Sequence, residues 1–193
     1  MAGVDDDTGA HGVAAALDGA RRGEPAAVAV LFHDLHPRLG RFLHAQEPRA
    51  ADDLAAEVWE AVARGLAGFQ GGEPELRAWV FSIARRRLAD HRRRAGRRRT
   101  EPTDAAAFAE RAGPAAPEGE ALDKLSAEHA AALVVALLPE DQAEVVLLRI
   151  LGDLSTEQVA AVMGRPVTWV RVNQHRAVRK LADRLGSRLG VTP

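Results

Sequence analysis

Arginines are the side chains of this sequence with the most evident chemistry, and they are concentrated in two segments. Residues 85–99 read RRRLADHRRRAGRRR, which contains nine arginines and a single acid, Asp90. The segment after Thr168 is basic as well. Arginines at this density repel one another unless an anion lies nearby, so both segments are expected to bind a polyanion such as nucleic acid. A solvated helix face or a disordered arm is the alternative interpretation of such a run.

The charges of the chain are segregated, although its 26 basic and 27 acidic residues nearly cancel. Residues 100–120 carry five acids and one arginine and separate the two basic segments. Two basic surfaces on either side of an acidic segment indicate two contacts with one polyanion.

The second basic segment belongs to a predicted helix-turn-helix over Leu154–Leu185. Ser155 can cap the first helix, and Gln158 three residues later completes a capping box. Gly164 is placed to end that helix, because glycine adopts the left-handed conformation without a steric penalty. Thr168 is then expected to cap the second helix.

The second helix of this pair divides into two faces at about 100° per residue. The core-facing set is predicted to be Val167, Val170, Ala177, Val178, Leu181 and Leu185. The opposite face contains Thr168, Val172, His175, Arg176 and Arg179, with Trp169 and Arg171 on its flanks. This combination suits a recognition helix in the major groove, where arginines reach guanine or phosphate and methyl groups meet thymine. An amphipathic helix with a solvated basic face is the alternative.

Composition excludes several other classes of protein. The 193 residues are 47% hydrophobic and include no cysteine, which rules out disulfides, thiolate metal sites and a cysteine nucleophile. No apolar run approaches the ~20 residues of a membrane span. The acidic N-terminus lacks the order of a signal peptide, so a cytoplasmic protein is expected.

Enzyme and cofactor motifs are absent from the sequence. It contains no phosphate-binding glycine loop, no HExxH and no Gly-x-Ser-x-Gly. His33 and His36 lie one helical turn apart, but without a third ligand two partly exposed histidines are the favoured interpretation over a metal site. A non-catalytic protein without metal or cofactor is expected.

The pattern of apolar residues predicts an all-α chain of two small modules. Residues 1–24 form a tail with a short helix over 13–20, and residues 1–9 are expected to be disordered. The first module spans 25–95, with helices over about 25–44, 52–66 and 74–94. A flexible acidic linker covers 96–120. The second module spans 121–188, with helices over about 122–138 and 139–151 before the helix-turn-helix. Its expected core includes Ile150, and that of the first module includes Val28 and Phe32.

Four segments, in order, resemble the extracytoplasmic-function (ECF, group 4) subfamily of the sigma-70 family of bacterial RNA polymerase sigma factors. LFHDLHPRLGRFL resembles the opening of sigma region 2. ADDLAAEVWEAV resembles its polymerase-docking helix, and LRAWVFSIARRRLADHRRR resembles the helix that opens and reads the −10 element. LPEDQAEVVLLRILGDLSTEQVAAVMG followed by VRVNQHRAVRKL resembles region 4, which reads the −35 element. The resemblance covers about 25–94 and 122–185.

This resemblance implies a sigma factor that gives core RNA polymerase promoter recognition and helps to open the strands. The partners it implies are the clamp helices of the largest subunit, the flap of the second-largest subunit, promoter DNA and an anti-sigma factor. A free-standing helix-turn-helix regulator that binds duplex DNA as a dimer is the main alternative. A sigma-like decoy that binds polymerase or an anti-sigma factor without initiating is another.

The resemblance also assigns candidate residues to three sites. The polymerase-binding candidates are Asp52, Asp53, Leu54, Glu57 and Trp59. The −10 candidates are Phe69, Arg77, Trp79, Arg85, Arg86 and Arg92, with the glycine-bounded loop Phe69–Glu73 holding a flipped base. The spacing of Trp79 favours burial over base contact. The −35 candidates are Ser155, Thr168, Trp169, Arg171, Val172, His175, Arg176 and Arg179. The sequence differs from the family pattern at four positions, where its own −35 specificity is expected to lie: Thr168, Trp169, Asn173 and Gln174.

Overall fold

The chain folds into helices throughout the part that the computed structural model describes, residues 7–98 and 118–189. The predicted tail contains α1 (Asp7–Arg21), and the first module contains α2 (Pro25–Gln46), α3 (Ala51–Gly65), the short 3-10 helix η1 (Leu66–Gly68) and α4 (Glu73–Arg98). The second contains α5 (Glu118–Leu137), α6 (Glu140–Ile150), α7 (Thr156–Met163) and α8 (Val167–Leu189). The predicted all-α class is confirmed. Most of the predicted acidic linker lies outside the described residues.

Local sequence signals set several helix ends as predicted. Pro25 occupies the start of α2, and the Ser155 hydroxyl accepts a hydrogen bond from the Gln158 backbone N–H to form the predicted capping box at α7. Gly164 ends α7 in the left-handed region at a φ of 62°. Thr168 lies inside α8 and not at its cap, because that helix already begins at Val167. Helix α1 begins at Asp7, so the disorder predicted through residue 9 is wrong for its last three residues.

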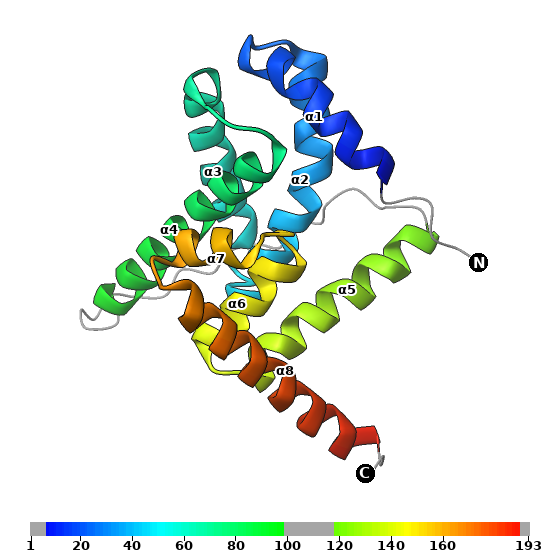
Figure 1. The fold of residues 1–193 in the computed structure, drawn as a ribbon, viewed down its shortest axis with the longest axis vertical. Coiled ribbons are helices and arrows are strands. Elements are labelled where there is room, and N and C mark those ends of the chain that lie inside the picture. The colour runs from blue at the N-terminus through cyan, green and yellow to red at the C-terminus, as the bar shows by residue number, and fades with distance from the viewer. Residues whose placement is uncertain (1–6, 99–117, 190–193) are drawn as a thin grey trace.

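The buried core is continuous between the two modules. In the first module, Leu35, Leu39 and Phe42 of α2 are fully buried, and the Phe42 ring meets Phe81 of α4 edge-on at 5.3 Å between centroids. The same cluster of buried side chains continues into the second module. Helix α7 therefore lies against α4, and α5 packs against α2 (Figure 1). Helix α6 meets α4 through side-chain ion pairs.

The turn between α6 and α7 fits closely against α4. A Cβ atom added at Gly152 would lie 3.4 Å from Cδ2 of Phe81. The Gln158 side-chain amide of α7 donates a hydrogen bond of 2.9 Å to the Pro74 carbonyl of α4. The two modules thus form one packed body, and the first turn of α4 carries part of the joint.

Several residues predicted to be core side chains are exposed. Val28 and Phe32 each have 38% of their surface exposed, and Ile150 has 67%. In α8, Val170 and Ala177 are buried as predicted, but Val178 is 58% exposed and Leu185 is 39% exposed. Helix α8 is longer than the helices that cover it, so the apolar stripe continues past the core.

Candidate nucleic-acid interface

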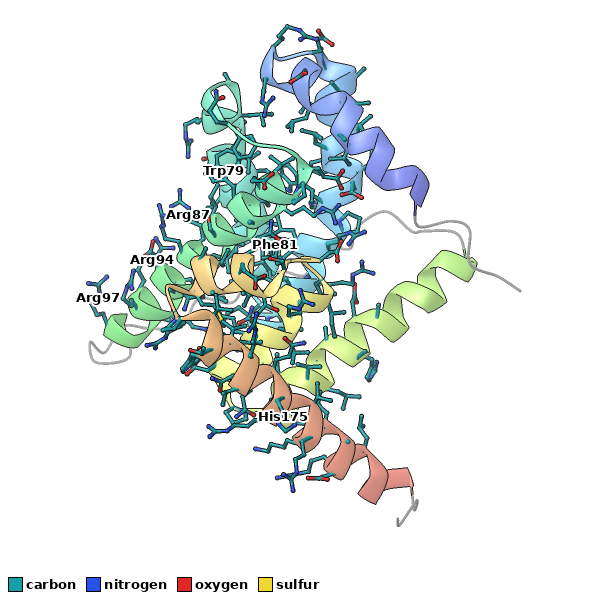
Figure 2. The ribbon with its side chains drawn as sticks, in the orientation of Figure 1. Trp79, Phe81, Arg87, Arg94, Arg97 and His175 are labelled. Atoms are coloured by element: carbon teal, nitrogen blue, oxygen red, sulfur yellow. The ribbon has the colours of Figure 1, made fainter. Side chains whose placement is uncertain are left out.

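The outer face of α8 is formed by the residues that the helical periodicity predicts. Thr168, Val172, His175, Arg176 and Arg179 are all exposed, and so is Arg171 on the flank. Figure 2 marks His175 near the middle of α8. This face combines arginines with one small apolar side chain, as a major-groove helix requires.

Glu157 of α7 borders this face and pairs with Arg171. The Glu157 carboxylate lies 3.4 Å from a guanidinium nitrogen of Arg171, and both side chains are mostly exposed. A hydrogen bond with the backbone N–H of Glu157 itself lowers the pKa of this carboxyl, and Arg171 adds to that shift. A solvent-exposed pair of this kind holds its arginine only weakly. Arg171 can therefore turn toward an incoming ligand at little cost.

Trp169 and Asn173 support the recognition helix and do not extend its outer face. The Trp169 ring is half-buried, and the Arg165 guanidinium lies over it at 5.3 Å from the centroid. Asn173 is buried, and its side-chain amide donates to the Trp169 carbonyl at 2.9 Å. Asn173 is therefore no surface determinant of specificity, which corrects the expectation for this position. The Ser155 hydroxyl is engaged in the helix cap.

The arginines on one side of α4 point toward the second module. Arg77 is 12% exposed and pairs with Glu73 and with Asp153, the latter at 2.5 Å. The Nε–H of Arg85 donates to Glu144 of α6 at 3.0 Å. Arg92 pairs with Glu47 at 3.0 Å and with Glu140 of α6. These three −10 candidates are thus neutralised by acids, most of them from α6 and the turn that follows it.

The opposite side of α4 carries a second set of arginines that is open to solvent. The candidate Arg86 is exposed, and Arg93, Arg94 and Arg97 are exposed with it. Figure 2 shows Arg87, Arg94 and Arg97 projecting from α4 away from α6 and α8. The periodicity of about 100° per residue already separates the two sets, because Arg86, Arg93 and Arg97 share a phase that Arg85 and Arg92 do not. The arginine run therefore forms two surfaces and not the single one expected from its composition.

Glu144 is a buried acid of the contact between the modules, with 8% of its surface exposed. Burial raises the pKa of Glu144 above its ordinary value, and the neighbouring Arg85 guanidinium opposes part of this shift. Folding therefore shifts the titration of this carboxyl toward higher pH than in the unfolded chain. The stability that Glu144 contributes is present in full below its ordinary pKa and is lost as the pH rises through the raised pKa. At neutral pH an amide should fit this position at least as well as the carboxylate.

The loop between η1 and α4 is built around two stacked aromatic rings. The Phe69 and Trp79 rings are 5.1 Å apart and inclined at 24°. Trp79 also fits against Gly65, where a Cβ atom would lie 2.8 Å from the ring. Trp79 is half-buried, so it serves as part of the core and as the base of the loop at once. Contact between Trp79 and a promoter base stays a prediction.

Helix α3 presents acids and an aromatic cluster on its outer side. Asp52 and Asp53 are exposed, and Glu57 lies 3.6 Å from Arg87. Leu54 is 1% exposed, so it belongs to the core and not to a docking surface, which corrects the expectation for this residue. The acids of the predicted polymerase-binding site are therefore at the surface, whereas its leucine is in the core.

The aromatic cluster beside these acids joins α3 to α2. The Trp59 indole N–H donates to Nδ1 of His36 at 3.1 Å, and the Phe32 ring stacks on His36 at 4.5 Å between centroids. Phe32 and Trp59 are themselves 4.8 Å apart. Partly exposed aromatic rings are enriched at protein interfaces. The spacing of apolar residues along α2 predicts Phe32 on the core-facing side, so its partial exposure differs from the prediction.

Metal and membrane sites find no support in the described ranges, 7–98 and 118–189. No group of three or more potential metal ligands occurs there, and His33 and His36 acquire no third ligand. None of the helices in those ranges has the length and hydrophobicity that a bilayer crossing requires.

Comparison with known proteins assigns both modules. Residues 31–98 match the family model for sigma-70 region 2, and residues 128–181 match that for sigma-70 region 4. The ECF RNA polymerase sigma factor ShbA of Streptomyces griseus is 33% identical over 189 residues, which cover 92% of this chain and 96% of ShbA. SigD of Mycobacterium tuberculosis is 37% identical over 138 residues, 70% of this chain and 63% of SigD. The chain therefore belongs to the ECF RNA polymerase sigma factor family, although it matches less than two thirds of the length of SigD.

Solved structures show the same fold. CnrH, in complex with the cytosolic domain of CnrY, superposes with a TM-score of 0.59 at 22% identity, over 91% of this chain and 98% of CnrH. The sigma factor RpoE of Bartonella quintana, in complex with the anti-sigma factor NepR, gives 0.59 at 20% identity, over 80% and 93% of the two chains.

Proposed function

We propose that this chain is a non-catalytic initiation factor that binds core RNA polymerase, reads the −10 and −35 promoter elements and helps to open the strands. The observation that supports this most strongly is the presence of two basic surfaces on separate modules, the outer faces of α4 and α8. Helix α3 adds an acidic and aromatic surface of the kind that a protein partner would cover. These activities place the protein in the cytoplasm, with the polymerase.

Run-off transcription with purified core polymerase tests this function directly. Addition of the chain should make transcription initiate at defined promoters, and sequencing of transcripts made on genomic DNA would identify both elements. A dimer that footprints duplex DNA without polymerase, and leaves run-off transcription unchanged, would instead establish a free-standing regulator.

Promoter engagement is proposed to require separation of the two modules. In the structure, Arg77, Arg85 and Arg92 are each paired with an acid of the second module, which competes with a nucleic acid backbone for them. The outer arginines of α4 remain accessible and can make the first contact, which is electrostatic and sensitive to salt. Binding of polymerase or DNA would then replace the acids of α6 with phosphates.

Regulation by an anti-sigma factor is proposed as well. Its support is the shared fold with CnrH and RpoE, which were solved with the cytosolic domain of CnrY and with NepR respectively. A protein that stabilises the packed arrangement of the modules would keep the inner arginines of α4 covered.

Arg176 is expected to read one base of the −35 element. It lies on the exposed face of α8, and replacement by alanine should cost about 1–3 kcal/mol and relax the preference at a single position. Transcription from promoters randomised over the −35 element would measure this. Arg184→Ala, about 12 Å farther along the helix, removes the same charge as a control. An equal loss over all sequences would identify Arg176 as a phosphate contact.

A further inference from the structure

Helix α1 fixes the loop that precedes α4 through its last residue, Arg21. The Arg21 guanidinium donates a hydrogen bond to the Gly71 carbonyl and lies over the Phe69 ring at 5.6 Å from the centroid. Its other terminal nitrogen pairs with Asp18 at 2.7 Å, which orients the guanidinium from within α1. One planar side chain thus holds both the backbone and the ring of the loop, which suits arginine better than lysine.

The loop has few other means of keeping one conformation. Residues 70–72 include two consecutive glycines, which lose more conformational freedom on ordering than other residues do. Gly71 has a φ of 132°, and a Cβ atom there would lie 2.7 Å from Cβ of Glu75. The Gly72 N–H donates to the Glu75 carboxylate at 2.9 Å. Glu75 therefore ties the end of the loop to α4, while Arg21 ties its beginning and middle to α1.

The position of the Phe69 ring connects these contacts to recognition. The ring contacts both the Arg21 guanidinium, at 5.6 Å, and the Trp79 ring, at 5.1 Å between centroids. A base that leaves the duplex must find a preformed surface, because unstacking costs a few kcal/mol. Each group that fixes the loop beforehand lowers the entropy lost when that base is bound.

We propose that Arg21 is a specificity-determining residue for the −10 element, acting as a positioning residue for the loop Phe69–Gly72. The proposal rests on the proposed function, since it assumes that this loop receives a promoter base. Helix α1 precedes the part of the chain that matches sigma-70 region 2, which begins at residue 31. The resemblance of the sequence to the family therefore assigned no role to Arg21.

Hydrogen exchange of the free, full-length chain tests the positioning step. In Arg21→Ala, amides of residues 69–72 should exchange about tenfold faster than in the wild type, because the loop loses a hydrogen bond and a cation–π contact. Arg21→Lys keeps the charge without the planar group and should also exchange faster. Arg22→Ala is the matched control, since Arg22 is paired with Glu24 on the surface. Unchanged exchange in both Arg21 variants would overturn the proposal.

Transcription by the reconstituted holoenzyme tests the specificity step. On promoters randomised over the −10 element, Arg21→Ala should reduce the preference at one position by about tenfold and leave the −35 preference unchanged. Arg21→Lys, which retains the charge, should not restore it. A uniform loss over all sequences, or rescue by lysine, would make Arg21 a phosphate contact and refute the proposal. If the wild type directs no promoter-dependent transcription, the proposed function fails and this role fails with it, whatever hydrogen exchange shows about the loop.

Discussion

Replacing Glu144 with arginine should separate the two modules and raise the affinity of the free chain for a −10 single strand. Glu144 is buried against α4 and accepts a hydrogen bond from Arg85 at 3.0 Å. Arginine at this position would place a third guanidinium beside Arg85 and Arg92. An uncompensated charge in a buried pair costs about 3–5 kcal/mol, which is comparable to the stability of a contact between domains.

Two measurements report whether the modules have separated. Small-angle scattering should show a larger radius of gyration for Glu144→Arg than for the wild type. Binding to a −10 oligonucleotide should tighten by about tenfold or more, with a steeper dependence on salt, because Arg85 loses its partner and Arg77 and Arg92 keep only their acids from the first module, Glu73 and Glu47.

Two control variants distinguish the loss of this contact from a general change in charge. Asp141→Arg makes the same charge change on α6 at an exposed position, so it should leave the radius of gyration unchanged. Glu144→Gln keeps an acceptor for Arg85 and removes a carboxylate whose pKa burial has raised, so the modules should stay packed at neutral pH. If Asp141→Arg tightened DNA binding as much as Glu144→Arg, the effect would be long-range attraction and the contact would not restrain binding.

The helices and their ends could be predicted because their causes are local. Ser155, Gln158 and Gly164 act on backbone groups within a few residues, and the structure confirms each of them. The exposed face of α8 follows from helical periodicity for the same reason. Thr168 was misplaced because Val167 already has helical geometry, a difference of one residue that no sequence pattern specifies.

The contact between the modules could not be predicted, because its partners are far apart in the sequence. Arg77 and Asp153 are 76 residues apart, and Arg85 and Glu144 are 59 residues apart. Phe81 shows the same difficulty in part: it lies about 20° from Leu88 on the helix, so periodicity places it on the apolar side where it packs on Phe42, but periodicity gives no sign of its second neighbour. That neighbour is the turn at Gly152, which lies against the fully buried Phe81 ring. Val178 shows the opposite case. It lies on the apolar side of α8, but that side extends beyond the helices that pack on it, so Val178 is exposed.

Replacing Trp59 with alanine should weaken binding to core polymerase, measured without DNA, by about 2 kcal/mol or more, which is roughly 30-fold in the dissociation constant. Trp59 connects Phe32 and His36 of α2 to the acids of α3, so its loss removes the largest ring and the contact that holds the other two. Trp59→Phe keeps an aromatic ring beside Phe32 but has no N–H for His36, and an intermediate loss is expected. Val30→Ala is the control, because Val30 is 40% exposed on α2 about 200° away from Phe32.

The salt dependence of polymerase binding shows how much of the affinity comes from the aromatic cluster and how much from the acids of α3. If Asp52 and Asp53 act by charge, the wild-type affinity should fall as salt rises. Trp59→Ala should show the same slope at a lower affinity, since it removes no charge, and Asp53→Asn should show a shallower slope. An unchanged affinity for Trp59→Ala together with a large loss for Asp53→Asn would mean that the surface is recognised by charge alone. The aromatic cluster would then be a support for α3, and the partner would need no apolar surface opposite it.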